Sequence, residues 1–215
     1  MAMNRYLLTI GLFLFYQLCD AQKADTIIIT KAYTCYYSFE LKDPIMVVYN
    51  LYHGGGDCKR EGFSFKTGEL KHRSATAKDY KGSSYDKGHL ANAEDFAFDC
   101  TLEESTFRYW NCYPQTPTLN RGIWKTLETQ IRKQSQHDSL LILCGGFYDD
   151  RKQIGDGVAI PTSCWKLVYS HTKHLILESA TYTNTDSPVR SDISLEELKR
   201  ILLTKYGIEL QNWLH

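Results

Sequence analysis

The sequence predicts one α+β domain, and three observations indicate this fold class. Short runs of Val, Ile and Tyr, separated by turn residues, follow an apolar leader in the first fifty residues. Near the middle of the chain, apolar residues recur at helical spacing. Further apolar runs then precede a closing segment that again has helical spacing. Strands, a helix, more strands and a last helix describe an α+β domain, and 215 residues suit one domain rather than two.

Six segments are expected to be strands, because they are short, apolar and bounded by turn residues. The first three are rich in β-favouring residues, and the last alternates only partly between apolar and polar side chains. The expected strands are 26–29, 33–39, 45–51, 140–143, 165–169 and 175–183.

Three helices are expected, two from capping boxes and one from periodicity. A capping box places a Glu three residues after a Ser or Thr, so it marks the first turn of a helix. The expected helices are 101–108, which opens with Thr101 and Glu104; 121–135; and a closing helix that opens with Ser194 and Glu197 and ends near Gly207.

The first 21 residues read as a signal peptide, which leaves residues 22–215 as a single domain. Arg5 gives the positive flank, residues 6–16 form the apolar core, and small residues stand at the two cleavage-determining positions. The apolar run is too short for a comfortable membrane span, so we expect an exported protein, periplasmic or secreted, without stable membrane insertion. Acylation of Cys19 is the alternative, but Leu18 is not the small residue that normally precedes such a cysteine.

Cysteine usage fits an oxidising compartment. One of the seven cysteines lies in the leader, and the remaining six allow up to three disulfides in fifteen pairings. None of their spacings is C-x-x-C, so a structural zinc site is not expected. The six are Cys35, Cys58, Cys100, Cys112, Cys144 and Cys164.

The charge balance gives no general affinity for polyanions, since the chain has 25 Lys and Arg against 25 Asp and Glu. A local basic groove stays open as an alternative to a solvated surface with scattered acids, which the charge alone favours. The basic residues concerned are Lys59, Arg60, Lys71, His72, Arg73, Lys78, Lys81 and Lys87.

Two stretches about twenty residues apart, 79–90 and 111–128, hold the candidate chemistry. The first presents His89 directly after a glycine, and the second places Asn120 and Glu128 eight residues apart across the start of the expected helix. A neutral imidazole can take a proton from water, and amide and carboxylate oxygens suit a hard cation. Taken alone, these residues could equally be a core histidine, a helix N-cap and a solvated helix acid. Together they form the minimum set for metal-assisted hydrolysis of a phosphodiester.

Residues 79–128 resemble the DNA/RNA non-specific endonucleases of the ββα-metal (His-Me finger) superfamily, a group that includes secreted bacterial nucleases and endonuclease G. The family's D-R-G-H motif appears as Asp-Lys-Gly-His at 86–89, and its pattern N-x-x-P-Q-x-x-x-L-N-x-x-x-W-x-x-L-E is met at 111–128. Weaker similarity at 144–148 and 160–166 extends the match over most of the chain after the leader. The resemblance implies a ββα-metal nuclease core on a mixed, mainly antiparallel sheet with flanking helices.

The resemblance also implies the roles of the metal-site residues. His89 is expected to be the general base, and Asn120 the one direct protein ligand of a hydrated Mg²⁺, for which Mn²⁺ could substitute. Glu128 would contact the same ion through water or orient the Asn120 amide. Asp86 would support the His89 loop by hydrogen bonding, and Gly88 would permit the tight backbone there.

Phosphate recognition is left with two candidate arginines. Arg60 and Arg73 both lie upstream of the D-R-G-H position, and we favour Arg60 as the catalytic one because an aromatic residue follows it, as in the family. Lys87, Arg73 and Asn111 are the candidate substrate contacts. Lys87 is the main departure from the family, which has Arg there, so a positive charge is kept but bidentate geometry is lost. Asn111 suits holding the loop before Asn120 better than touching substrate.

The expected function is therefore an exported, Mg²⁺-dependent, sugar-non-specific endonuclease that acts on DNA and RNA. The alternatives are a phosphodiesterase of small nucleotides, which the neutral charge allows, and a non-catalytic nucleic-acid-binding relative. The second would be expected to have lost His89 or Asn120, and both are present. Strand and sugar preference, a homodimer, and an immunity or inhibitor partner are not determined by the sequence.

Overall fold

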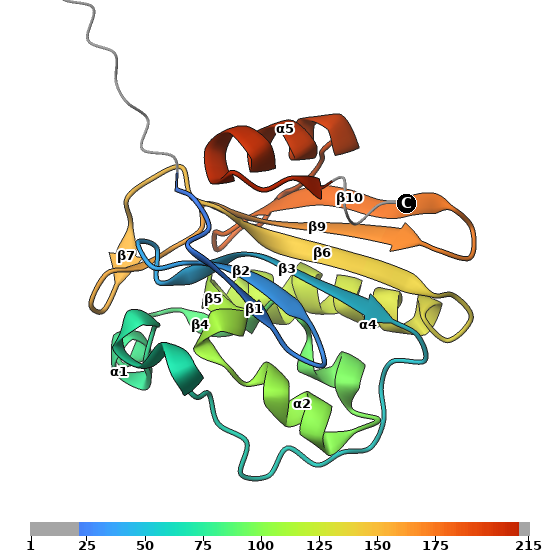
Figure 1. Ribbon diagram of the computed structural model, residues 1–215, viewed down its shortest axis with the longest axis horizontal. Helices are drawn as coiled ribbons and strands as arrows, with labels where there is room; N and C mark the ends of the chain where they lie inside the picture. Colours follow the sequence, from blue (N-terminus) through green and yellow to red (C-terminus); the bar gives the residue numbers. More distant parts are fainter. Residues whose placement is uncertain (1–21, 211–215) are drawn as a thin grey trace, which may run out of the picture.

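A seven-stranded antiparallel sheet forms the centre of the molecule, for which a computed structural model describes residues 22–210 (Figure 1). The strand order β1-β2-β3-β6-β9-β10-β11 brings strands from the first fifty residues beside strands that follow residue 139. The strands are β1 (Thr26–Ile29), β2 (Thr34–Ser38), β3 (Asp43–Leu51), β6 (Leu140–Phe147), β9 (Ser163–Ser170), β10 (Leu175–Thr183) and β11 (Arg190–Asp192).

The central strands of this sheet, β3, β6 and β9, are buried on both faces. Side chains along a strand alternate between the two faces, so each strand contributes to two cores. In β6, Leu141 and Leu143 belong to the core cluster of helix α5 (Leu195–Tyr206). Ile142 and Cys144 belong to the cluster of helix α4 (Lys125–Gln134) on the opposite face. Burial on both faces explains why this strand is a continuous apolar run in the sequence.

A second, two-stranded antiparallel sheet carries the first motif on the α4 side of the molecule. It pairs β4 (Asp86–His89) with β5 (Cys112–Gln115), and Leu90 and Tyr113 belong to the same core cluster as α4. The two sequence motifs therefore meet on one face of the main sheet. The remaining short elements are η1 (Gly68–Arg73), α1 (Ala77–Tyr80), η2 (Ala93–Phe96), α2 (Cys100–Thr106), η3 (Tyr109–Asn111), α3 (Pro117–Leu119), η4 (Asn120–Trp124), β7 (Gln153–Ile154) and β8 (Val158–Ala159).

The predicted α+β class is confirmed, with three differences in detail. All strand pairs of the main sheet in residues 22–210 are antiparallel, so the sheet is not mixed. Helix α2 is capped by Asp99, whose side chain accepts from the N–H groups of Thr101 and Leu102, and not by Thr101. Helix α4 begins at Lys125, because the wider turn η4, with non-helical backbone at Gly122, separates it from α3.

One disulfide, Cys58–Cys100, forms among the six cysteines of the described residues, and the other four are buried thiols. The register of the main sheet explains why one of the possible disulfides does not form. Cys35 in β2 and Cys144 in β6 both pair with Val47 of the intervening strand β3. Two strands apart is roughly 10 Å, beyond the ~7 Å that a disulfide can bridge. The expectation of up to three disulfides therefore reduces to one.

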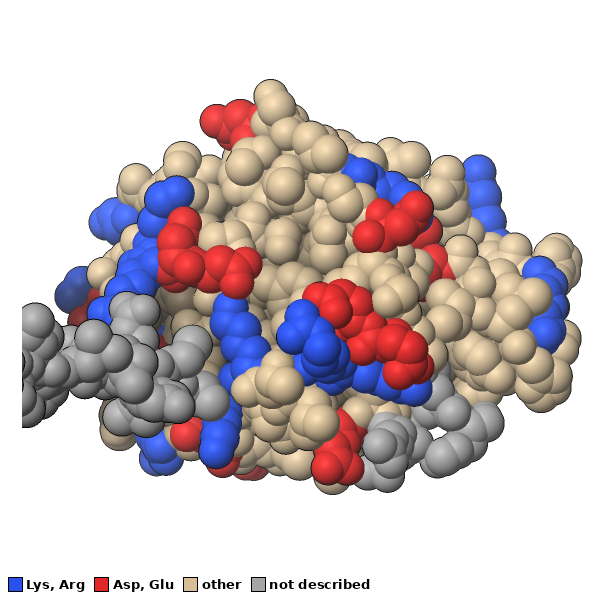
Figure 2. All heavy atoms as spheres, turned by 90° about the horizontal axis from the view of Figure 1, so that it is seen from above, with Lys and Arg blue, Asp and Glu red and all other residues tan. Residues whose placement is uncertain are grey.

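The predicted signal peptide, residues 1–21, lies outside the described residues. Between residues 22 and 210, no helix is long and apolar enough to cross a membrane. The face that carries α5 shows Lys and Arg interspersed with Asp and Glu (Figure 2). Ion pairs such as Arg200–Glu197 and Lys199–Glu196 hold opposite charges together on this helix. The described residues of this face consequently form no track of a single sign for a polyanion.

Candidate functional site

His89 ends strand β4, and pairing with β5 fixes its backbone. The antiparallel register sets His89 opposite Cys112 and Gly88 opposite Tyr113. A Cβ atom at Gly88 would lie 2.2 Å from Oε1 of Gln115. Glycine is thus required beside the histidine by the close approach of the Gln115 side chain.

The His89 imidazole lies between two aromatic rings. The ring centroids of Phe65 and Phe107 are 4.8 and 4.9 Å from that of His89. Its Nε2 is buried and makes no hydrogen bond within residues 22–210. Burial, and then the charges of Arg60 and Lys87, lower the pKa of His89 from 6.5 to about 3. The ring is therefore neutral at ordinary pH and keeps a nitrogen free of protein partners.

Asn120 lies at the junction of α3 and η4. Thr116 is the N-cap of α3, since its Oγ1 accepts from the N–H of Leu119, so Asn120 does not serve as the cap considered from the sequence. Instead, Asn120 Nδ2 donates to Oδ2 of Asp86 at 2.9 Å. No donor to Asn120 Oδ1 is found in the described part of the chain. The amide is oriented with its oxygen available to another ligand.

The Asp86–Asn120 hydrogen bond joins the two motifs, and Asp86 lies on the strand that presents His89. The same carboxylate accepts from Arg121 Nε at 2.8 Å and from Nη2 at 2.5 Å. Burial acts to raise the pKa of Asp86, but hydrogen bonds from Arg121 and Asn120 hold it below its usual value. Asp86 therefore supports the amide of the second motif, whereas the sequence placed its support at the His89 loop.

Of the two candidate arginines, Arg60 carries the charge that acts on His89. Arg60 forms ion pairs with Glu94 and Glu103, and its charge is among the causes that lower the His89 pKa. Arg73 instead stacks on Phe39, with its guanidinium carbon 3.3 Å from the ring centroid. The structure brings Arg60 into the electrostatic surroundings of His89 and places Arg73 against Phe39, which directly follows strand β2.

Lys87 lies over two aromatic rings next to the histidine. Its Nζ is 5.6 Å from the centroid of Phe65 and 5.3 Å from that of Tyr80. No carboxylate within ion-pair distance of Nζ is found among residues 22–210. The ammonium charge is held close to His89 without a neutralising partner, which suits contact with a phosphate.

Asn111 is fully buried and holds the loop that follows His89. Its Oδ1 accepts from the N–H of Ala91, and its Nδ2 donates to the carbonyls of Ala91 and Thr106. The amide thus has three backbone partners and 0% exposure. The loop it holds comes directly after the histidine, whereas the sequence placed this support before Asn120.

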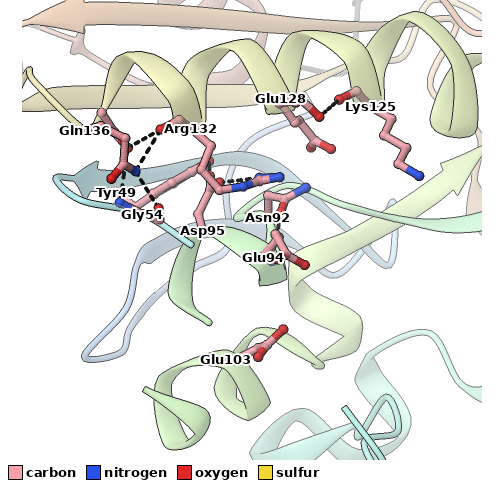
Figure 3. A network of polar contacts seen from close by, with 12 residues as sticks. Tyr49, Gly54, Asn92, Glu94, Asp95, Glu103, Lys125, Glu128, Arg132 and Gln136 are labelled. Carbon is pink, nitrogen blue, oxygen red and sulfur yellow. Dashed lines mark hydrogen bonds and ion pairs between the residues drawn. The ribbon is translucent and has the colours of Figure 1, made fainter. Parts of the chain in front are cut away.

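Glu128 is buried on α4 within a group of charged side chains. Figure 3 shows Glu128 and Arg132 projecting from α4 toward the segment that carries Asp95. Glu128 Oε1 lies 3.5 Å from Nζ of Lys166, and Asp95 accepts from Arg132 at 2.8 Å. Burial raises the pKa of Glu128 while Lys166 opposes this shift. Lys166, 1% exposed, was not a predicted site residue.

The side chains fit a cation that keeps most of its waters. No group of three or more His, Cys, Asp and Glu able to hold a metal ion occurs in residues 22–210. A closed protein cage is therefore not what this region offers. The free Oδ1 of Asn120 offers a hard oxygen instead, and Glu128 is a carboxylate eight residues further along the chain. Mg²⁺ usually takes few protein oxygens and keeps several of its waters.

Comparison with known proteins identifies relatives of this chain. A model of the family described as DNA/RNA non-specific endonuclease matches residues 14–208. Human mitochondrial endonuclease G is 30% identical over 156 residues, which are 66% of this chain and 52% of the relative. The bovine protein is 29% identical over 182 residues, 77% of this chain and 61% of the relative. The chain thus spans between half and two thirds of the length of these curated relatives.

A bacterial relative and a solved structure extend the comparison. A nuclease of Nostoc sp. is 38% identical over 90 residues, 41% of this chain and 33% of the relative. A crystal structure of the EndoG/EndoGI complex contains a chain with a TM-score of 0.69 and 25% sequence identity. The alignment covers 81% of this chain and 82% of that chain, so the similarity extends over most of both folds.

Proposed function

Because the chain belongs to the DNA/RNA non-specific endonuclease family, we propose that it is an exported, metal-dependent, sugar-non-specific endonuclease that hydrolyses phosphodiester bonds of DNA and RNA. The observation that carries the proposal is the hydrogen bond between Asp86 and Asn120. It joins the proposed metal ligand to the strand that ends in His89, which supports the proposal that base and ligand act in one site. Residues 1–21 would direct export.

His89 is proposed to be the general base. The rings of Phe65 and Phe107 hold the imidazole in place, and Nε2, which has no hydrogen-bond partner among residues 22–210, is the atom that would accept the proton. The low pKa keeps the ring neutral, although it also makes the imidazole a weaker base. Gly88 supports the position of His89 by leaving room for the Gln115 side chain. Asn111 supports it by holding the loop that follows His89.

Asn120 and Glu128 would hold the metal ion, Mg²⁺ with Mn²⁺ as a substitute. When bound, the ion would neutralise charge on the phosphate and stabilise the departing oxygen. Asn120 would offer Oδ1 directly, since Asp86 occupies its amide nitrogen. Glu128 would act through water from its buried position beside Lys166.

Phosphate contact is proposed for Arg60 and Lys87. Arg60 would face the negative charge that builds up at the phosphorus, and its influence on His89 supports its choice over Arg73. Lys87 would supply charge without a bidentate contact. Asn111 would brace the site and not touch substrate, because its amide is fully occupied.

The test uses the chain 22–215 with plasmid DNA, RNA and a small phosphodiester, each with Mg²⁺ or EDTA. The variant His89→Ala is expected to lose on the order of 10²–10⁴-fold in rate, because the proton acceptor is removed. The matched control is His137→Ala, which changes an exposed histidine in the turn that follows α4; this variant should cleave normally. Polynucleotide cleavage that survives EDTA or His89→Ala would overturn the mechanism.

The same experiment distinguishes the proposed endonuclease from a phosphodiesterase of small nucleotides, which is the second candidate function. The neutral charge of the chain and the mixed charges over α5 are compatible with a phosphodiesterase of small nucleotides. Turnover of the small ester without cleavage of either polynucleotide would favour that function, whereas binding without any turnover would favour a non-catalytic relative.

A further inference from the structure

The segment that carries Arg60 lies along helix α2 and is attached to it at several points. We name residues 58–66 the arginine loop; Figure 1 shows the chain in this region running beside α2. The loop begins at the Cys58–Cys100 disulfide and ends where Lys66 pairs with Glu104 at 2.7 Å. Between these ends, Arg60 contacts Glu103 of the same helix. The start, the middle and the end of the loop are therefore all attached to the same helix, α2.

Two carboxylates hold the Arg60 guanidinium, and they differ sharply in burial. Glu103 contacts Nε from α2 and its side chain is 0% exposed, whereas Glu94 contacts Nη2 from η2 and is 45% exposed. Figure 3 shows these two glutamates on their separate elements. Nη1 of Arg60 has no acceptor among residues 22–210. The guanidinium is thus fixed along one edge, with its remaining donors available.

Burial decides which of the two contacts can be exchanged. Glu103 Oε2 is buried and finds no partner within the described residues, and among these residues Arg60 is the cation that pairs with this carboxylate. Separating a buried carboxylate from its only cation leaves an uncompensated charge away from water, which is strongly unfavourable. The exposed Glu94 can return to solvent at little cost, because an exposed ion pair contributes little.

On the basis of the function proposed above, we propose that Glu103 is the positioning residue for the catalytic Arg60, and that Glu94 is a displaceable partner whose place a substrate phosphate takes. The buried anchor would hold Nε while substrate binds. The exposed carboxylate would compete with the phosphate for Nη2. Glu103 would then act on turnover, and Glu94 on affinity.

The first test measures kcat and KM for Glu103→Gln, Glu94→Gln and Glu104→Gln. Glu103→Gln should lower kcat by about ten-fold or more with KM nearly unchanged, since a small misplacement of a catalytic group has large effects. Glu94→Gln should lower KM by roughly two- to five-fold, because a competitor is removed. Glu104→Gln is the matched comparison on the same helix; it removes an exposed ion pair at the end of the loop and should change kcat and KM much less than the other two variants. A rise in KM for Glu94→Gln would overturn the proposed exchange.

A second test asks whether Glu103 acts through Arg60. In an Arg60→Ala background, Glu103→Gln should cause no further loss of kcat, because the group that it positions is gone. An equal loss in both backgrounds would show an independent structural role and overturn the proposal.

A third readout does not require activity. The Nε–H of Arg60 should give a slowly exchanging ¹⁵N-resolved NMR signal, assigned by its absence in Arg60→Lys. We expect Glu103→Ala to abolish this signal, Glu103→Gln, which keeps an acceptor oxygen, to weaken it, and Glu104→Gln to preserve it; persistence in Glu103→Ala would overturn the proposal. Because this signal is independent of cleavage, it distinguishes failure of the Glu103 proposal from failure of the proposed nuclease function.

Discussion

Two halves of the candidate site are held in place by different means. The hairpin half, residues 86–90 and 111–128, rests on backbone pairing between β4 and β5 and on side chains of the main core. The arginine loop, residues 58–66, has mainly exposed residues. Among the described residues its backbone is hydrogen-bonded to other segments only at its two ends, from Cys58 to Ala97 and through the Lys66 bridge. It is attached instead by the disulfide, ion pairs and aromatic contacts.

The difference indicates which functions tolerate motion. The proposed base and metal ligand belong to a part of the fold that cannot shift without disturbing the core. The proposed phosphate-binding arginine is positioned by side chains, so the loop can loosen while the fold persists. Substitutions in the two halves should consequently separate assembly of the metal site from positioning of the arginine.

Among the substitutions that test this comparison, the largest effect is expected at Asp86, which hydrogen-bonds the proposed metal ligand from the strand that carries the proposed base. Asp86→Ala should lower the cleavage rate and the affinity for Mn²⁺ by about 10–100-fold, because the Asn120 amide is no longer oriented. Asp86→Asn keeps an acceptor oxygen and should lose less. Rates at varied Mg²⁺, together with Mn²⁺ binding followed by calorimetry, measure both quantities.

Arg121→Ala is the matched control for this prediction. It removes the other partner of the same carboxylate but leaves the hydrogen bond to Asn120. If Arg121→Ala weakens Mn²⁺ binding as much as Asp86→Ala, the link between the two motifs is not what organises the metal site.

Much of this half could be predicted because its signals are local. The strand at 26–29 coincides with β1, and Gly207 ends α5 with a positive φ of 67°, as a helix C-cap requires. His89 and Asn120 were singled out from motif order. The cap of α2 was misplaced, although Asp99 stands directly before the helix and is a good N-cap residue. The sequence therefore contains the correct cap signal at Asp99, but the Thr101–Glu104 pattern resembles a capping box and favours the wrong position.

The partners of the site residues could not be predicted, because they join positions far apart in the chain. Glu103 lies 43 residues from Arg60, and Lys166 lies 38 residues from Glu128. The choice between Arg60 and Arg73 depends on the path of the loop after the disulfide, and six cysteines alone allow fifteen pairings. Such contacts follow from tertiary packing, which the spacing of residues in the sequence does not predict.

A moderate effect is expected when the arginine loop is released at its start. Cys58→Ala/Cys100→Ala should lower kcat by about ten-fold, because the loop no longer holds Arg60 near His89. The free energy of unfolding should fall by about 2–4 kcal/mol, since the unfolded chain gains freedom. Activity is measured well below the unfolding transition, and stability by denaturant titration.

A thiol count checks the disulfide on which this prediction depends. Alkylation of denatured, unreduced chain 22–215 should modify four cysteines, namely the buried thiols, and alkylation of native protein should modify none. Unchanged kcat in the double variant would mean that ion pairs alone position the loop.

The smallest effect is expected from Lys87, which stands between the two halves. A nearby positive charge disfavours the imidazolium ion, so Lys87 helps to keep the pKa of His89 below 6.5. Rate is lost as pH falls through this pKa, because the protonated ring cannot accept a proton; the acid limb should therefore lie well below pH 6.5. Lys87→Gln should raise the pKa and move the limb to higher pH by roughly half a unit.

Lys87→Arg keeps the charge and should leave the acid limb where it is, while restoring the residue that the family usually has. The measurement is kcat/KM for a small phosphodiester as a function of pH, in which polynucleotide charge does not interfere. A limb that moves equally in both variants would mean that Lys87 acts on His89 by packing against Phe65 and not by its charge. The hairpin half would then depend on the aromatic ring that the arginine loop contributes, and the two halves would be less independent than their attachments suggest.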